Sequence, residues 1–350
     1  MKKNTLANGQ PPRVLESSGP GDVRIGPVIA IPAVLAELGV RPRRAFAQAG
    51  VDPRLFQDPD GRIPFEALGK LFESSVALTG CHHFGLLVGE RFDLRGLGPL
   101  GLLMRNSATV GEALRALLMH LYLHDRGAAP LLLLPDDSRA ILGYSIYRHG
   151  VPATAQIYDA ALAIGQAILR ELCGPEWKPL RVQFSHGKPE RIAPYRRLFR
   201  SSVTFDAELS GVVFATSWLE RAIAGADATL HAFLDKAIRQ TQADSPTAFT
   251  DQVQGMLHQL VLGGSASADA VARLFAIHER TLRRRLAKEG ANLQQLINQT
   301  RFQLAKQLLQ NTGLPVSEIA AALQYADPNA FTRAFRGWAG LSPTQWRERN

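Results

Sequence analysis

The sequence is poor in cysteine and has no long apolar run. Two cysteines in 350 residues allow one disulfide at most, which excludes a disulfide scaffold and fits a reducing cytosol. The longest apolar stretches, such as Leu131–Leu134 and Ala160–Ile164, fall far short of the roughly 20 residues that cross a bilayer. No apolar stretch follows Met1-Lys2-Lys3-Asn4, so we expect no signal peptide. We therefore expect a protein of the cytoplasm, without a membrane partner.

Motifs of the common enzyme classes are also missing. Neither a Gly-rich phosphate loop ending in Lys-Ser/Thr nor a Gly-x-Ser-x-Gly nucleophile elbow occurs. Cys81-His82-His83 has metal-binding residue types, but no second Cys/His group follows at ligand spacing. His120 and His124 share a helix face, but no glutamate directly follows His120. We favour ordinary histidines over a zinc site, and predict no metal, no cofactor and no enzymatic activity.

Basic charge is concentrated near the end of the chain. The whole sequence has a net charge of +9, and residues 266–350 contain twelve Lys and Arg against six Asp and Glu. Two thirds of the net charge therefore belongs to the last quarter. A basic segment of this kind is compatible with nucleic-acid binding without proving it.

Composition and hydrophobic patterning divide the chain into segments. Residues 8–27 contain eight Gly or Pro, which predicts a disordered leader over 1–27. Residues 28–240 mix helical periodicity with short strand patterns and predict an α+β domain. The polar residues 239–248 include Pro246 and predict a linker at 241–248. From 249 to 350 only helical patterns appear, which predicts a separate all-α domain.

Several elements of the first domain can be placed by pattern. Strands are expected in a hairpin of 131–134 and 140–147, and at 180–185, 203–205 and 211–214. Helices are expected at 31–39, 43–49, 65–78, 109–124, 156–173 and 219–237. Five aromatic residues could line a ligand pocket, although simple core packing is the more common role: Phe84, Tyr122, Tyr144, Tyr147 and Tyr158.

The last eighty residues contain an internal repeat. The segments 271–277 and 319–325 both begin with a β-branched residue and Ala, followed by large apolar residues four and six positions after the first. A second helix follows each segment, anchored by Leu282 and Leu286 in the first copy and by Phe331 and Phe335 in the second. Two short helices with a small residue at their crossing describe a helix-turn-helix unit.

The second helix of each unit presents a cationic face on the side opposite its anchors. The outward residues of the first unit are Arg280, Thr281, Arg284 and Lys288, with Arg283 and Arg285 on the flanks. In the second unit Asp327 is a suitable N-cap and Pro328 a suitable first helical residue. Its outward residues are Asn329, Arg333 and Arg336. Arginine can pair with guanine and asparagine with adenine in the major groove, so this face predicts DNA binding.

One long helix is expected between the two units, over Leu293–Asn311. A rigid connector fixes the distance between the reading helices. If both enter successive major grooves on one face of a duplex, their centres lie about 34 Å apart.

The carboxy-terminal segment resembles the AraC-type family of bacterial transcription regulators. The resemblance is strongest over 316–320 and 325–343, with further matches at 271–272, 280–286 and in the connecting helix. Two turn positions that usually hold Gly in the family hold Ala276 and Gln324, and His278 stands where a Ser cap is more usual. The first domain, over about 29–224, is similar to the α+β regulatory domain of the ornithine-utilisation-regulator branch, commonly labelled arabinose-binding-like.

The resemblance implies a ligand-responsive transcription regulator. We expect the α+β regulatory domain to bind a small-molecule effector and to pair with its twin as a homodimer. The all-α DNA-binding domain, with two helix-turn-helix units joined by a long helix, is expected to bind a double-stranded operator and, as an activator, to act beside RNA polymerase. The sequence identifies no effector and no ligand-binding residues. The alternative is a constitutive DNA-binding factor whose first domain is only an oligomerisation scaffold.

Overall fold

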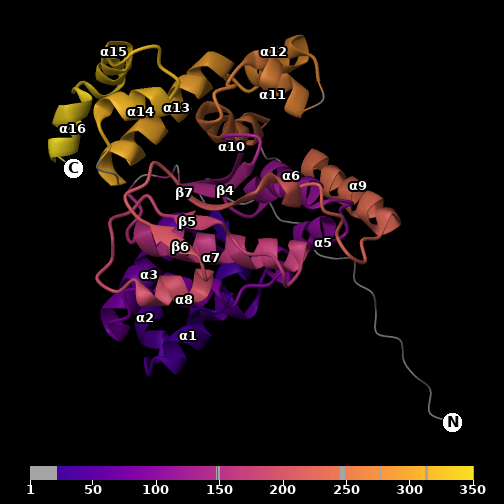
Figure 1. Ribbon diagram of the computed structural model, residues 1–350, viewed down its shortest axis with the longest axis vertical. Helices are drawn as coiled ribbons and strands as arrows, with labels where there is room; N and C mark the ends of the chain where they lie inside the picture. The colour runs from indigo at the N-terminus through magenta and orange to yellow at the C-terminus, as the bar shows by residue number, and fades with distance from the viewer. Residues whose placement is uncertain are drawn as a thin grey trace.

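The structure is a computed structural model that describes residues 22–146, 148, 150–244, 249–275, 277–311 and 314–349. An α+β domain precedes an all-helical domain, as the sequence predicts. Figure 1 shows the helical domain as a layer above the α+β domain. The longer helices of the first domain are α1 (Ile31–Glu37), α2 (Pro42–Ala49), α3 (Phe65–Thr79), α4 (Phe84–Gly89), α5 (Pro99–Arg105), α6 (Val110–His120), α7 (Thr154–Cys173), α8 (Ala193–Phe199) and α9 (Ala228–Asp244).

A five-stranded sheet in the order β3-β4-β7-β5-β6 forms the centre of the first domain. Only the β5–β6 pair is parallel. The predicted hairpin is confirmed, with Leu132 paired to Leu142. The strands are β3 (Ala128–Leu133), β4 (Arg139–Ile146), β5 (Arg181–Gln183), β6 (Ser202–Thr204) and β7 (Ser210–Ala215).

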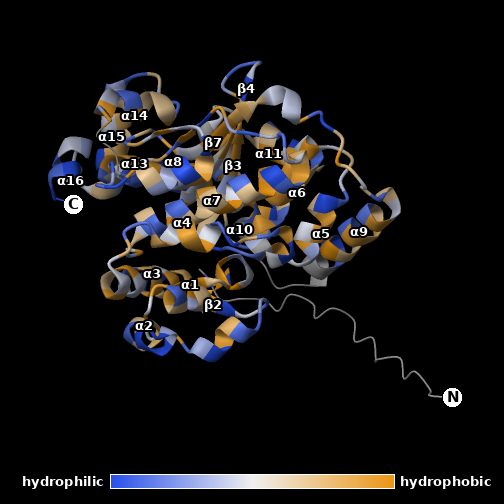
Figure 2. Ribbon diagram, turned by 60° about the horizontal axis from the view of Figure 1, so that its bottom comes forward, coloured by the Kyte–Doolittle hydropathy of each residue, from blue (hydrophilic) through white to orange (hydrophobic). Residues whose placement is uncertain are grey.

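Both faces of this sheet are covered by helices. α7 packs against β4 and β7, whereas α10 (Phe249–Leu262) of the second domain packs against β3. β3 and β7 are predominantly hydrophobic in Figure 2. A strand covered on both sides reads as a nearly continuous apolar run, which explains why these strands lack a clean alternation. The second domain is therefore in direct contact with the sheet of the first.

Two predicted boundaries need correction. The leader was expected to reach residue 27, but β1 (Asp22–Arg24) pairs with β2 (Arg62–Pro64), and Ile25 is fully buried. The apolar Val23 and Ile25 are part of the core, and residues 1–21 of the expected leader lie outside the described residues. The helix expected at 219–237 begins at Ala228 instead, because the chain first makes turns after η5 (Thr216–Trp218).

The expected linker also differs in part. Residues 241–244 belong to the end of α9, which stops at Asp244. Residues 245–248 lie outside the described residues. No helix in the described part of the chain is both long enough and apolar enough to cross a membrane.

The helices of the second domain in the described ranges differ in how they begin. They are α10, α11 (Ala268–Leu274), α12 (Glu279–Lys288), α13 (Leu293–Asn311), α14 (Val316–Ala322), α15 (Pro328–Ala339) and α16 (Pro343–Arg349). Ser267 caps α11 by accepting a hydrogen bond from the Ala270 amide at 3.1 Å, and Asp327 caps α15 through the Ala330 amide at 2.8 Å. His278 stands at the N-cap of α12 in extended conformation, but its side chain accepts no capping bond.

Replacing His278 by serine supplies the missing cap. Because its backbone already has the N-cap conformation, a serine hydroxyl can accept from a free amide of the first turn. We expect His278→Ser to raise the free energy of unfolding by about 0.5–1 kcal/mol. Urea unfolding of the two chains checks this, and His278→Ala, which supplies no acceptor, is the control. Equal stability of the Ser and Ala variants would contradict the assignment of position 278 as an N-cap without a side-chain acceptor.

His258 on α10 is a buried titratable group in the second domain. It is 0% exposed, and its Nδ1–H donates to the Gln254 carbonyl oxygen at 3.1 Å. Burial lowers the pKa of His258 to about 4, against 6.5 for an exposed histidine. The folded protein thus keeps this ring neutral at pH values where the unfolded chain protonates it.

This depressed pKa predicts a loss of stability in acid. The stabilisation is complete above pH 6.5 and is lost as the pH falls toward 4, because only the unfolded chain then gains the proton. Between pH 6.5 and 4.5 the free energy of unfolding of the wild type should fall by about 1.4 kcal/mol more per pH unit than that of His258→Leu. Urea unfolding at stepped pH values measures the difference. A stability difference that stays constant over this range would refute the prediction.

Candidate nucleic-acid interface

The first helix-turn-helix unit consists of α11 and α12, which pack through a small apolar core. Leu282 and Leu286 of α12 are 0% and 1% exposed, and they join Val271 and Ala272 of α11 in one cluster. The cluster also includes Phe249 and Val253 of α10. The predicted inward face of α12 is confirmed.

The opposite face of α12 is cationic and open. Arg280, Arg284 and Lys288 are exposed, and Thr281 is half-buried. Within the described residues, none of these three cations has an acidic partner. Arg283 is also exposed, with Glu279 at 3.5 Å.

Arg285 differs from its neighbours because it packs against the domain. Its guanidinium lies 5.4 Å from the centre of the Phe249 ring on α10, within the range of a cation–π contact. The sequence placed it on the flank but could not identify this partner, since Phe249 is far away along the chain. Arg285 therefore belongs to the packing of the unit.

The second unit repeats this design with aromatic anchors. Phe331 and Phe335 of α15 are both 0% exposed and pack with Ile319 and Ala320 of α14. Asp327 and Pro328 are the N-cap and first residue of α15, as predicted. The inward positions also include Trp338, which lies 5.5 Å from the Phe302 ring of α13.

The outward face of α15 carries the residues that the sequence predicts. Asn329, Arg333 and Arg336 are exposed. Neither arginine has an ion-pair partner in the part of the chain that the structure describes. The eight residues proposed for DNA contact thus form two separate groups, one on α12 and one on α15.

The turn of the second unit contains a left-handed residue. Gln324 has φ +59°, a region in which a side chain usually costs about 1–2 kcal/mol relative to glycine. Its side chain lies against Gly264 after α10, where an added Cβ would be 3.1 Å from the Gln324 amide. The corresponding Ala276 of the first unit lies outside the described residues.

α13 links the two units because it is part of both cores. Leu296 and Ile297 belong to the first cluster, whereas Leu304 and Leu308 belong to the second. A helix of 19 residues is about 28 Å long, which is close to the roughly 34 Å of one duplex turn. Figure 1 shows α12 and α15 toward opposite ends of the upper layer, away from the sheet of the first domain.

Comparison with known proteins agrees with this geometry. The family model "Arabinose-binding domain of AraC transcription regulator, N-term" matches residues 39–223, and a "Helix-turn-helix domain" model matches 271–349. The regulator VirS of Mycobacterium tuberculosis is 29% identical over 90% of this chain and 93% of its own length. The ornithine utilization regulator of Pseudomonas aeruginosa is 31% identical, with the same two coverages.

A solved structure is also similar over most of the chain. The crystal structure of the transcriptional regulator CdpR from Pseudomonas aeruginosa matches with a TM-score of 0.44 and 24% identity, covering 91% of this chain and 96% of that one. The two family models and the full-length sequence relatives settle the classification. This chain belongs to the AraC family of transcription regulators, and its two helix-turn-helix units form the DNA-binding domain of that family.

Proposed function

We propose that this DNA-binding regulator responds to a small-molecule effector in its first domain and activates transcription as a homodimer beside RNA polymerase. It acts in the cytoplasm, where operator DNA and RNA polymerase are, and catalyses no reaction. The observation that carries the DNA-contact assignment is the exposed cationic face of α12 and α15, opposite anchors that are buried. A side chain without an internal partner is available to pair with a base or phosphate.

The residues divide into two roles. Arg280, Thr281, Arg284, Asn329 and Arg333 contact base edges from the centres of the two outward faces. Arg283, Lys288 and Arg336 contact phosphates. The exposed pair of Arg283 with Glu279 does not prevent this role, because such surface ion pairs contribute only about 0–1 kcal/mol and exchange readily.

The homodimer is supported by an apolar surface on the first domain. Helices α5 and α9 pack against each other. Leu102 on α5 is 49% exposed and Phe233 on α9 is 68% exposed. Large apolar side chains that stay exposed on adjacent helices are typical of protein–protein contacts.

Single substitutions test the DNA contacts. Using DNA selected by the wild type from a randomised library, we expect Arg284→Ala and Arg333→Ala each to weaken binding by about 1–3 kcal/mol and to relax preference at one base pair. Lys288→Ala should weaken binding to all DNA sequences alike. It should also reduce the salt dependence of the binding constant by about one released counterion. Fluorescence anisotropy titrations at several salt concentrations measure both effects.

Arg54→Ala is the matched control for these variants. It removes the same charge from an arginine whose side chain is 84% exposed in the first domain, and it should leave DNA affinity unchanged. If Arg284→Ala behaved like Arg54→Ala in both affinity and base preference, the base-contact role of Arg284 would be wrong.

A further inference from the structure

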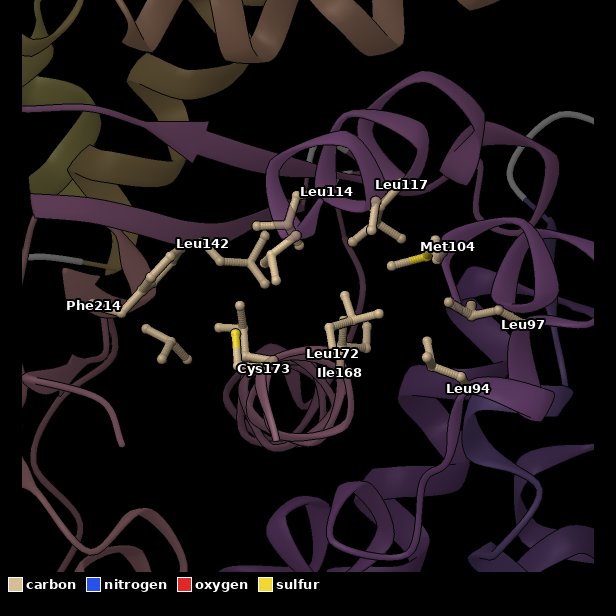
Figure 3. Packing of buried hydrophobic residues seen from close by; sticks show 14 of the residues in the cluster. Leu94, Leu97, Met104, Leu114, Leu117, Leu142, Ile168, Leu172, Cys173 and Phe214 are labelled. Atoms are coloured by element: carbon tan, nitrogen blue, oxygen red, sulfur yellow. The ribbon is translucent and has the colours of Figure 1, made fainter. Parts of the chain in front are cut away.

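The first domain contains a small apolar cavity between α7 and the β3–β4 edge of the sheet. Its volume is about 100 Å³. Leu97, Leu117, Leu142 and Ile168 are among the residues that line it, and Figure 3 shows them within the packed hydrophobic core around α7. They come from η3 (Leu94–Leu97), α6, β4 and α7, and residues of α3 and β3 also line the cavity.

A glycine on α7 leaves part of this space open. A Cβ added at Gly165 would meet only one atom within 4 Å, Leu142 Cδ2 at 3.7 Å. Two glycines of α4, in contrast, allow α4 to approach α7 closely. A Cβ added at Gly85 or Gly89 would come within 2.1 or 2.5 Å of a backbone carbonyl oxygen of α7. An alanine at position 165 would fit and would favour the helix. The glycine is therefore not needed for close helix packing, and its effect is to leave space in the cavity.

One buried polar atom in the wall of this cavity, Nε2 of His124, has no hydrogen-bond partner among the described residues. His124 lines the cavity and is 1% exposed. Its Nδ1 lies 3.5 Å from Nη1 of Arg24. A guanidinium only donates, so Nδ1 carries the lone pair. Burial, together with the nearby Arg24 and Arg62, holds the pKa of His124 well below its usual value, and the ring is neutral.

The neutral ring must carry its proton on the other nitrogen. Nε2 of His124 has no hydrogen-bond partner among the described residues. The two neighbouring polar residues are satisfied, since the Tyr144 hydroxyl donates to Asp125 Oδ2 and the Asp125 Oδ1 accepts from the Gly127 amide at 2.8 Å. The lining therefore offers one unpaired N–H donor in apolar surroundings, where an unmade hydrogen bond is costly.

We propose that this cavity is the effector site and that it binds a compact, uncharged, mainly apolar ligand with one hydrogen-bond acceptor, which receives the Nε2–H of His124. The proposal rests on the ligand-responsive function given above. An apolar cavity of roughly 150 Å³ holds benzene, so the smaller volume of about 100 Å³ here sets a single six-membered ring as the upper size of the ligand. A monosaccharide does not suit it, because most of its hydroxyl groups would be buried without partners.

The cavity is one strand away from the DNA-binding domain. Successive residues of β4 point to opposite faces of the sheet. Leu142 and Tyr144 line the cavity, whereas the Ser145 hydroxyl donates to Oε1 of Gln307 on α13 at 3.3 Å. Movement of β4 by a ligand thus reaches α13, the helix that holds both reading units. The aromatic residue Tyr144, one of five considered from the sequence, lines the site.

Cyclohexanone is the probe, and methylenecyclohexane is its isostere without an acceptor. In the full chain, cyclohexanone should raise the melting temperature saturably by roughly 2–4 °C, and the isostere by less than half as much. Gly165→Ala, which adds a methyl group that occupies part of the cavity, should remove the effect of cyclohexanone. The matched control Gly337→Ala, a helical glycine with nothing within 4 Å, should keep it.

His124→Leu tests the hydrogen bond. This variant should respond equally to the two probes, because the donor is gone. The proposal is overturned if wild type gives no saturable shift with cyclohexanone, if Gly165→Ala responds as wild type does, or if wild type does not distinguish the probes. Binding of selected DNA by wild type and Gly165→Ala is measured in parallel. Intact DNA binding without a cyclohexanone response refutes the cavity alone, whereas a wild type that selects no DNA refutes the proposed function.

Discussion

The sharing of α13 between two hydrophobic cores is the constraint on which the DNA-binding domain depends. Leu296 and Ile297 are buried with the first unit, and Leu304 and Leu308 with the second. Neither unit can shift along or around this helix without exposing the side chains of its own core. Since each buried leucine contributes roughly 1.5–3 kcal/mol, such a shift is expensive. The helices α12 and α15 are therefore held at a fixed distance and orientation relative to each other.

The sheet of the first domain lies between the apolar cavity and the DNA-binding domain. One face of the sheet packs against α7, with the apolar cavity at its edge, and the other face packs against α10 of the second domain. Ligands shift an equilibrium only by their differential affinity for two arrangements. Contact between β3 and α10, and between β4 and α13, gives the structure a direct way to make DNA-binding geometry depend on how the sheet is packed.

The outward, cationic face of α12 could be predicted from sequence because helical periodicity depends on local residues. Once Leu282 and Leu286 are anchors, the 3.6-residue repeat alone decides that Arg284 points outward. The left-handed residue Gln324 stands at a turn position where the resemblance to the family places a glycine.

Features that depend on distant partners could not be predicted. β1 has three residues and its partner strand is some forty positions away, so composition alone places it in the leader. The same limit applies to Arg285, which would be a free cation without the Phe249 ring beneath it. The cavity beside Gly165 is a further case, because a glycine inside a helix indicates neither close packing nor empty space until the facing strand is known.

The spacing of the recognised DNA tests the rigid two-helix account most directly. Sequences selected by the full chain from randomised DNA should contain two short blocks of preferred bases with centres about 10 base pairs apart, one helical turn on the same face. Inserting about half a turn between the blocks should abolish specific binding, because α13 cannot follow the rotation. Recovery of a single block, or binding that tolerates the insertion, would contradict the account.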